Sequence, residues 1–121
     1  MSVSAGFVDM LKEQLAEFGS VSVRRMFGGA GIYNDGVMFG LIADDTLYLK
    51  ADDINRSAFE AESMKPFAYQ GRGGNVAIMS YWQVPERLLD DPDELAAWAR
   101  GALAAAHRAA SNRVKRSGKR R

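Results

Sequence analysis

Residues 21–50 decide the fold, and they read VSVRRMFGGAGIYNDGVMFGLIADDTLYLK. This stretch holds four short runs of β-favouring residues, separated by glycine, asparagine and aspartate, which favour turns. The runs are Val21 to Phe27, Ala30 to Tyr33, Val37 to Ala43 and Thr46 to Lys50. Because so few residues connect them, consecutive runs must be antiparallel neighbours. The stretch therefore predicts four strands of one antiparallel sheet.

The turns within this stretch are marked by residues that accept a positive φ. Asn34-Asp35-Gly36 predicts a hairpin turn, because aspartate and glycine adopt such backbone conformations at low cost. Asp44-Asp45 marks the next turn. The run between the two turns, Val37 to Ala43, is apolar on both faces, which is typical of a central strand.

A helix is expected before the sheet, because apolar residues recur there at helical spacing. These residues are Phe7, Leu11, Leu15 and Phe18. Ser4 is placed to cap the N-terminus of this helix, and Gly19 stands where a C-terminal glycine is expected. The apolar side of the helix should pack against the sheet.

After the sheet stretch, the sequence predicts a short helix and a second hairpin. Polar residues Asp52, Asp53 and Asn55 can cap a helix that carries Phe59, and Pro66 ends any helical option. The alternating residues of the hairpin lie on either side of the glycine-rich loop 71–75, and they are Phe67, Tyr69, Val76, Ile78 and Trp82.

The last helix has the clearest start. Asp91 can act as N-cap, Pro92 suits the first helical position, and Glu94 completes an Asp-x-x-Glu variant of the capping box. We expect this helix to end near Asn112.

These elements predict an α+β fold in two layers, with an antiparallel sheet and helices packed on one of its faces. The predicted order is α-β-β-β-β-α-β-β-α. The length of 121 residues fits one domain. We expect residues 1–106 to form this domain, and residues 107–121 to hold the end of the last helix and a basic, disordered tail.

The composition excludes several kinds of chemistry. Cysteine is absent and His107 is the single histidine, which excludes disulfides, thiol catalysis, cysteine-ligated zinc and multi-histidine metal centres. The acidic pairs at positions 44–45, 52–53 and 90–91 fall at predicted turns or helix starts, where capping accounts for aspartate. We therefore predict no catalytic residue, no metal and no cofactor.

The net charge of +1 conceals a division along the chain. Residues 1–94 hold eight basic and fifteen acidic side chains, whereas residues 95–121 hold eight basic and no acidic ones. Such asymmetry indicates an anionic partner for the basic end. We predict sequence-independent contacts with nucleic-acid phosphates from Arg108, Arg113, Lys115, Arg116, Lys119, Arg120 and Arg121. A solvated tail without a partner is the alternative.

No apolar run approaches the roughly 20 residues that a membrane helix needs. The first five residues also lack the basic side chain of a secretory signal. The sequence thus predicts a cytoplasmic protein with no membrane contact.

The most distinctive stretch consists of Arg24, Arg25, Met26, Phe27, Gly28, Gly29, Ala30 and Gly31. Its glycines would let backbone amides approach a phosphate, helped by the two arginines. However, neither the P-loop pattern nor the dinucleotide fingerprint is complete. We favour a tight bend that needs glycine, and keep a ligand or partner contact as the alternative.

The same stretch opens a longer similarity to a known family. It is carried by Met26 to Tyr33, Gly36 to Ile42 and Leu47 to Asp52. Further matching positions are Phe59, Met64, Pro66, Phe67, Tyr69, Tyr81, Pro85, Leu88, Leu89 and Trp98. Over about residues 5 to 105, the chain resembles the N-terminal domain of the TfoX/Sxy competence regulators.

The resemblance implies a bacterial two-layer α+β domain that is similar to the secretion-chaperone fold. It also implies a transcriptional co-regulator of DNA-uptake genes that works with the cAMP receptor protein, and no catalytic residue. Full-length regulators of this family carry a second, helical C-terminal domain. Here a basic tail stands in its place, and a stand-alone N-terminal-type protein is expected.

Three functions follow as hypotheses. The first is a non-enzymatic regulatory or adaptor protein whose body contacts a protein partner and whose tail contacts DNA or RNA. The second is a small-molecule or nucleotide-binding domain that uses the junction from Arg24 to Gly31. The third is a dimeric, chaperone-like interaction module.

Overall fold

The computed structural model describes residues 3–26 and 28–119, with side chains described as far as Arg113. Its elements in chain order are α1 (Ala5–Gln14), β1 (Ser22–Met26), β2 (Gly29–Asn34), β3 (Val37–Ala43), β4 (Thr46–Lys50), α2 (Arg56–Ala61), β5 (Pro66–Gly71), β6 (Gly74–Gln83), the 3₁₀-helix η1 (Glu86–Asp90) and α3 (Pro92–Lys119). The described strands form one antiparallel sheet in the order β1-β2-β3-β4-β6-β5. The predicted α+β class and the order of its helices and strands are confirmed, with η1 as an addition.

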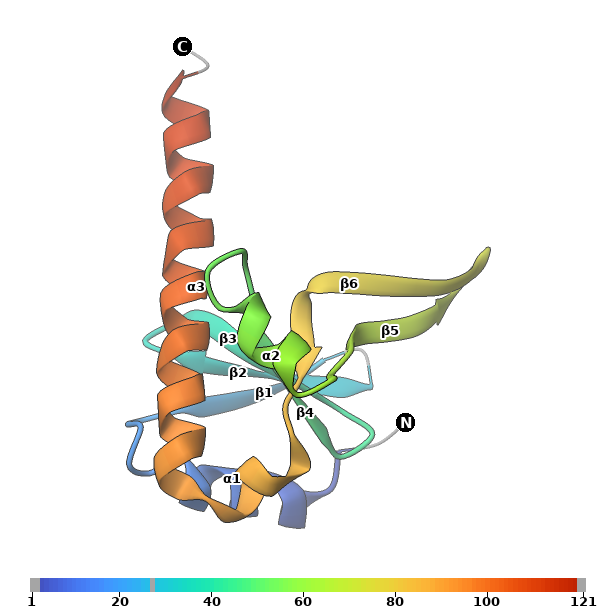
Figure 1. Cartoon of the computed structure of the whole chain (residues 1–121), viewed down its shortest axis with the longest axis vertical. Helices are drawn as coiled ribbons and strands as arrows, with labels where there is room; N and C mark the ends of the chain where they lie inside the picture. Colours follow the sequence, from blue (N-terminus) through green and yellow to red (C-terminus); the bar gives the residue numbers. More distant parts are fainter. Residues whose placement is uncertain (1–2, 27, 120–121) are drawn as a thin grey trace.

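The core lies between the sheet and α3, which runs along one side of it (Figure 1). Alternate residues of β3 and β4 point into this core, because successive side chains of a strand face opposite ways. The buried side chains of the sheet include Ile32, Phe39, Ile42, Leu47 and Leu49, and those of α3 include Leu95, Ala99, Ala102 and Ala106. The alanines let α3 lie close to the strands.

The first helix is capped as predicted but ends earlier. The Ser4 hydroxyl accepts a hydrogen bond from the Phe7 amide at 3.1 Å. The helix stops at Gln14, and the chain then turns to Gly19, whose φ is +142°. Leu11 and Leu15 are buried, and Phe7 is half-buried against the same core. The predicted packing of this segment against the sheet is confirmed.

A bulge at Phe39 sets the two faces of β3. Ile32 pairs with Gly40 and Tyr33 pairs with Met38, so Phe39 is the extra residue of the bulge. A bulge shifts the alternation of side chains by one position. Phe39 is therefore directed into the core, where its ring lies 5.0 Å from that of Phe18.

A larger shift in the pairing of β5 with β6 changes the direction of the β5–β6 hairpin. Pro66 pairs with Trp82, but the next residue, Phe67, pairs with Ile78. Within the intervening segment, the Met79 carbonyl accepts a hydrogen bond from the Trp82 indole at 2.9 Å. The outer part of the β5–β6 hairpin consequently projects from the body on the side away from α3 (Figure 1).

The last helix begins where predicted and is longer than expected. The Asp91 carboxylate accepts a hydrogen bond from the Glu94 amide at 3.1 Å, as an N-cap does. The Glu94 carboxylate, however, pairs with Arg87 of η1 at 2.6 Å. Helix α3 continues past Asn112 to Lys119, and its last turns extend beyond the sheet (Figure 1).

Candidate functional site

The glycine-rich junction lies between two antiparallel strands, as predicted. Arg24 pairs with Gly31 and Met26 pairs with Gly29, so the junction is the turn of the β1–β2 hairpin. Gly28 adopts a φ of +79°, which favours glycine. Phe27 lies outside the described residues. No helix starts at this turn in the described part of the chain, which agrees with a bend and differs from a phosphate loop.

Close approach of two strands explains the glycine at position 29. A Cβ atom on Gly29 would lie 2.5 Å from the carbonyl oxygen of Ile42, far inside contact distance. The obstacle is backbone of β3, which cannot rotate away as a side chain could. Glycine is therefore required here for strand packing.

The two arginines of the junction do not converge on one ligand. Successive residues of a strand face opposite ways. The Arg24 guanidinium lies 5.6 Å from the centre of the Tyr33 ring. The Arg25 guanidinium donates a hydrogen bond to the Val3 carbonyl at 2.8 Å and so holds the N-terminal segment. Neither arginine lines the groove that the neighbouring glycines form.

A groove of about 630 Å³ runs between the β1–β2 turn, β3 and β5. Its lining residues are Met26, Gly28, Gly29, Leu41, Ala43, Phe67, Tyr69 and Gln70. The volume lies within the range of pockets that take small ligands or partner side chains, and most of the lining is apolar. The groove is thus suited to apolar groups rather than to phosphate.

Aromatic rings continue the groove along β4 and β5. The Tyr48 and Phe67 rings meet edge to face with centres 5.0 Å apart, and the Phe67 and Tyr69 rings stack at 6.1 Å. Burial raises the pKa of the Tyr48 phenol, with a smaller contribution from the charge of Asp44. These ring contacts join β5 to β4 and present a flat apolar surface.

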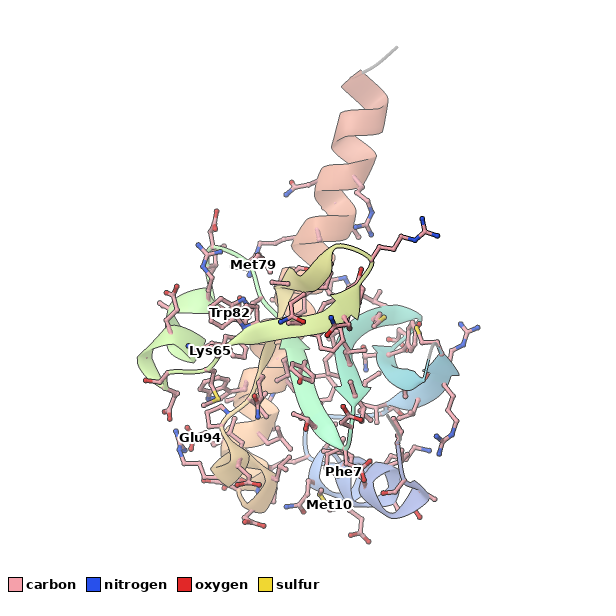
Figure 2. All side chains as sticks on the ribbon, turned by 90° about the vertical axis from the view of Figure 1, so that its right-hand side faces the viewer. Phe7, Met10, Lys65, Met79, Trp82 and Glu94 are labelled. Atoms are coloured by element: carbon pink, nitrogen blue, oxygen red, sulfur yellow. The ribbon has the colours of Figure 1, made fainter. Side chains whose placement is uncertain are left out.

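The β5–β6 hairpin also exposes apolar side chains to solvent. Tyr69 is 45% exposed, Val76 37% and Met79 56%. Figure 2 looks onto the hairpin, with Met79 far from Phe7 and Met10 of α1. Exposed apolar groups clustered on one element are typical of interaction sites. Tyr69 also lines the groove, and Val76 pairs with Tyr69 across the hairpin, so we define the hairpin surface as Tyr69, Val76 and the groove lining.

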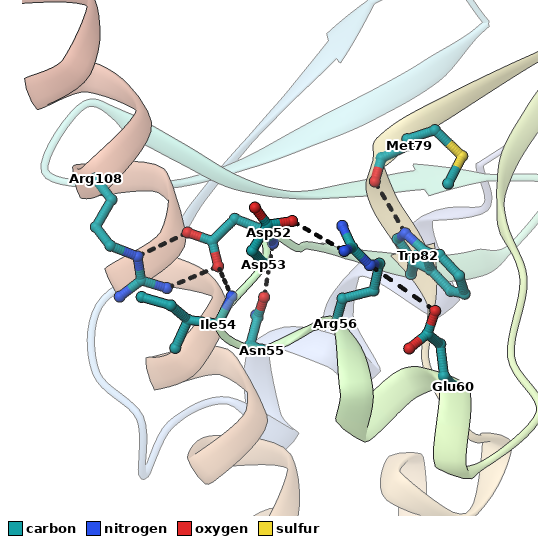
Figure 3. Close-up of polar contacts among 9 residues, drawn as sticks. All are labelled: Asp52, Asp53, Ile54, Asn55, Arg56, Glu60, Met79, Trp82 and Arg108. Atoms are coloured by element: carbon teal, nitrogen blue, oxygen red, sulfur yellow. Dashed lines mark hydrogen bonds and ion pairs between the residues drawn. The ribbon is translucent and has the colours of Figure 1, made fainter.

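Both acidic side chains at positions 52–53 form ion pairs with arginines. The Asp52 carboxylate accepts hydrogen bonds from Arg108 Nε at 2.7 Å and from its Nη2 at 2.9 Å (Figure 3). It also accepts one from the Ile54 amide at 3.0 Å. The hydrogen bond from Arg108 is the largest cause that lowers the pKa of Asp52. The Asp53 carboxylate pairs with Arg56 at 2.9 Å.

The residues predicted to contact nucleic acid lie in different surroundings in the structure. Arg108 is held by Asp52 at the body, where a phosphate would have to compete with a carboxylate. Arg113 lines a pocket beside Lys50. The side chains of Lys115, Arg116, Lys119, Arg120 and Arg121 lie outside the described part of the chain, so their contacts with nucleic acid stay a prediction.

Two kinds of feature are absent from the described residues. Among them, no group of three or more histidine, cysteine, aspartate or glutamate side chains is placed to hold a metal ion. Within the same residues, no helix is both long and apolar enough to cross a membrane.

The sequence did not predict two groups of side chains that the fold brings together. Phe67 and Tyr69 meet the glycine turn, and Lys50 meets Tyr81 and Arg113. Both depend on how β5 and β6 pair with the first four strands. The alternation of Phe67 and Tyr69 was the available signal, because it placed both rings on one face of a strand.

The fold and groove define a class: a two-layer α+β domain with a glycine-built hairpin turn beside an apolar groove. A family model described as the TfoX N-terminal domain matches residues 13–106, and the chain belongs to this family. It is similar to the DNA transformation protein TfoX1 of Aliivibrio fischeri (strain ATCC 700601 / ES114), with 29% identity over 79 residues. That match covers 65% of this chain and 37% of the relative, a little over a third of the relative's length.

Proposed function

We propose that this chain is a non-enzymatic regulatory or adaptor protein of the DNA-uptake type. Its body contacts a protein partner through the hairpin surface, and its basic end contacts nucleic acid. Family membership and the name of the relative, a DNA transformation protein, support the regulatory part. The single observation that carries the proposal is the apolar groove beside the family's glycine turn.

A protein partner suits this surface better than a charged ligand does. Protein interfaces combine a well-packed apolar centre, rich in aromatic residues and methionine, with a polar rim. The groove supplies the apolar depression, with Met26 in its lining, and Tyr69 supplies an exposed aromatic side chain. The partner we propose is a component of the transcription machinery or a regulator of the cAMP receptor protein type.

The basic end suits a second, anionic partner. Residues 1–94 carry a surplus of acidic side chains and would repel DNA, so attraction must come from residues 95–121. A protein with this division can hold a protein partner on its body while its basic end touches nucleic acid. We propose a co-regulator that works in this way.

The test is the transcript profile of a strain that lacks this gene. Complementation with the intact chain should restore the profile, and Tyr69→Glu should fail to do so, because a carboxylate in the groove prevents apolar docking. Ile54→Glu is the matched control, since Ile54 is 68% exposed and lies outside the groove. Equal complementation by both variants would contradict the proposal, provided that both accumulate to the wild-type level.

One observation favours a second candidate function. A groove of about 630 Å³ also fits a small apolar ligand. The nucleotide form of this alternative has less support, because Arg24 and Arg25 engage Tyr33 and Val3 and do not line the groove.

A further inference from the structure

A second pocket, of about 380 Å³, lies between α3 and the opposite end of β2 from the groove. Its walls come from the β2–β3 turn, from adjacent positions of β4 and β6, and from α3. The lining residues are Gly36, Val37, Met38, Lys50, Tyr81, Ala106, Ala109, Ala110 and Arg113. The three alanines leave room that longer side chains on this face of α3 would fill.

Two cations face this pocket without an acidic partner. Lys50 and Tyr81 are paired across β4 and β6, and the Lys50 ammonium lies 5.0 Å from the centre of the Tyr81 ring. Arg113 reaches the pocket from α3. Among the described residues, neither Lys50 nor Arg113 forms an ion pair.

The nearby carboxylate is already engaged. Asp52 attracts Lys50, but its two oxygens bind the guanidinium of Arg108 at 2.7 and 2.9 Å. The Asp52 and Arg108 charges therefore largely cancel, and the positive charges of Lys50 and Arg113 remain. Two positive charges that line one pocket without an acidic partner indicate an anion-binding site.

The pKa shifts of Lys50 and Tyr81 agree with an anion-binding site. Burial and the charge of Arg113 lower the pKa of Lys50. Burial raises the pKa of Tyr81 to about 12, so its phenol keeps its proton and stays a hydrogen-bond donor at neutral pH. An anion between these groups would relieve the repulsion between the cations and accept hydrogen bonds from them.

We propose that Lys50, Arg113 and Tyr81 form a binding site for a phosphate group, either of a small phosphate ester or of a nucleic-acid backbone. Phosphate offers several acceptor oxygens and at least one negative charge, which match an ammonium, a guanidinium and a phenol. Arg113 is one of the proposed contacts of the basic end, but Lys50 and Tyr81 belong to β4 and β6, and so the site goes beyond those contacts.

The experiment is a titration of the full chain, with ¹⁵N-labelled lysine, by inorganic phosphate at constant ionic strength. Binding should shift the Lys50 ammonium signal in a saturable way and raise its pKa. Arg113→Gln, followed by the Lys50 signal, should weaken phosphate binding at least about tenfold, the loss expected for a charged hydrogen bond. Lys50→Gln lacks that signal, so its phosphate binding is measured by isothermal titration calorimetry beside the intact chain, and it should show a similar loss. Arg72→Gln removes an exposed cation in the β5–β6 turn and should leave binding unchanged.

Folding does not confound this test. Lys50→Gln removes one of two cations that repel each other, and Arg113 is exposed on a helix, so both variants should keep the wild-type unfolding temperature. Equal phosphate binding by Arg113→Gln and the intact chain would overturn the proposal, as would shifts that match those caused by chloride. Once phosphate binds, a 5′-mononucleotide and a short DNA duplex are added as competitors. Displacement by the duplex alone assigns the site to nucleic acid, and displacement by the mononucleotide assigns it to a small ester.

Discussion

Gly29 shows how a single residue fixes the approach of two strands. A Cβ atom there would lie 2.5 Å from the Ile42 carbonyl oxygen. We expect Gly29→Ala to lower the free energy of unfolding by about 1–3 kcal/mol, the usual cost of overpacking a core. Urea unfolding measures the effect. Gly6→Ala is the matched control, because a Cβ on Gly6 meets nothing within 4 Å, and the two variants should not behave alike.

Asp52 makes stability depend on pH. Its pKa is lowered in the folded state, chiefly by the hydrogen bond from Arg108. The carboxylate therefore contributes stability above the pKa of the unfolded chain, about 3.9, and this contribution is lost as pH falls through the lower folded pKa. We expect Asp52→Asn to make the acid loss of stability shallower below about pH 4.

The Arg108→Gln variant provides a control for the pH profile. Removing Arg108 should remove the largest part of this component, and the double variant should add little to Asp52→Asn, because the two residues act as a pair. Thermal unfolding measured from pH 2 to 7 tests this. Additive changes in the double variant would contradict the pairing.

At the scale of elements, hydrophobic pattern and turn residues predicted most of the fold. The four strands within residues 21–50, the later hairpin and the Asp91 cap could be predicted because each has a local signal. The bulge at Phe39 could not, because Val37 to Ala43 is apolar on both faces and a shift in alternation leaves no trace there. The 3₁₀-helix η1 was also missed, as its five residues are too few to show a period.

The basic end of α3 carries its own prediction. The affinity of the intact chain for duplex DNA should fall with salt, with a slope of about −0.9 per phosphate neutralised. Deleting residues 114–121 removes five cations and should flatten the slope by about 0.9 for each phosphate that these cations neutralise. Fluorescence anisotropy measures both slopes. The tail would be a solvated terminus if the two proteins bound DNA alike, or if neither bound at about 50 mM salt.

Across the whole molecule, the two candidate sites lie at opposite ends of β2. The apolar groove adjoins the turn before β2, and the cationic pocket adjoins the turn after it. The glycine turn itself could be predicted from the sequence. The groove and the pocket could not, because residues 67–70 and Tyr81 reach them only through the pairing of β4 with β6. Such long-range pairing leaves no local signal.

The hairpin surface as a protein-binding surface is the central claim, and photo-crosslinking in the native cell tests it most directly. A photoreactive amino acid would replace Tyr69 in the full chain, or Ile54 as the exposed apolar control outside the groove. The prediction is a discrete adduct with a transcription protein from position 69 and none from position 54, identified by mass spectrometry. Equal adducts from both positions, or no protein adduct from position 69, would contradict the claim.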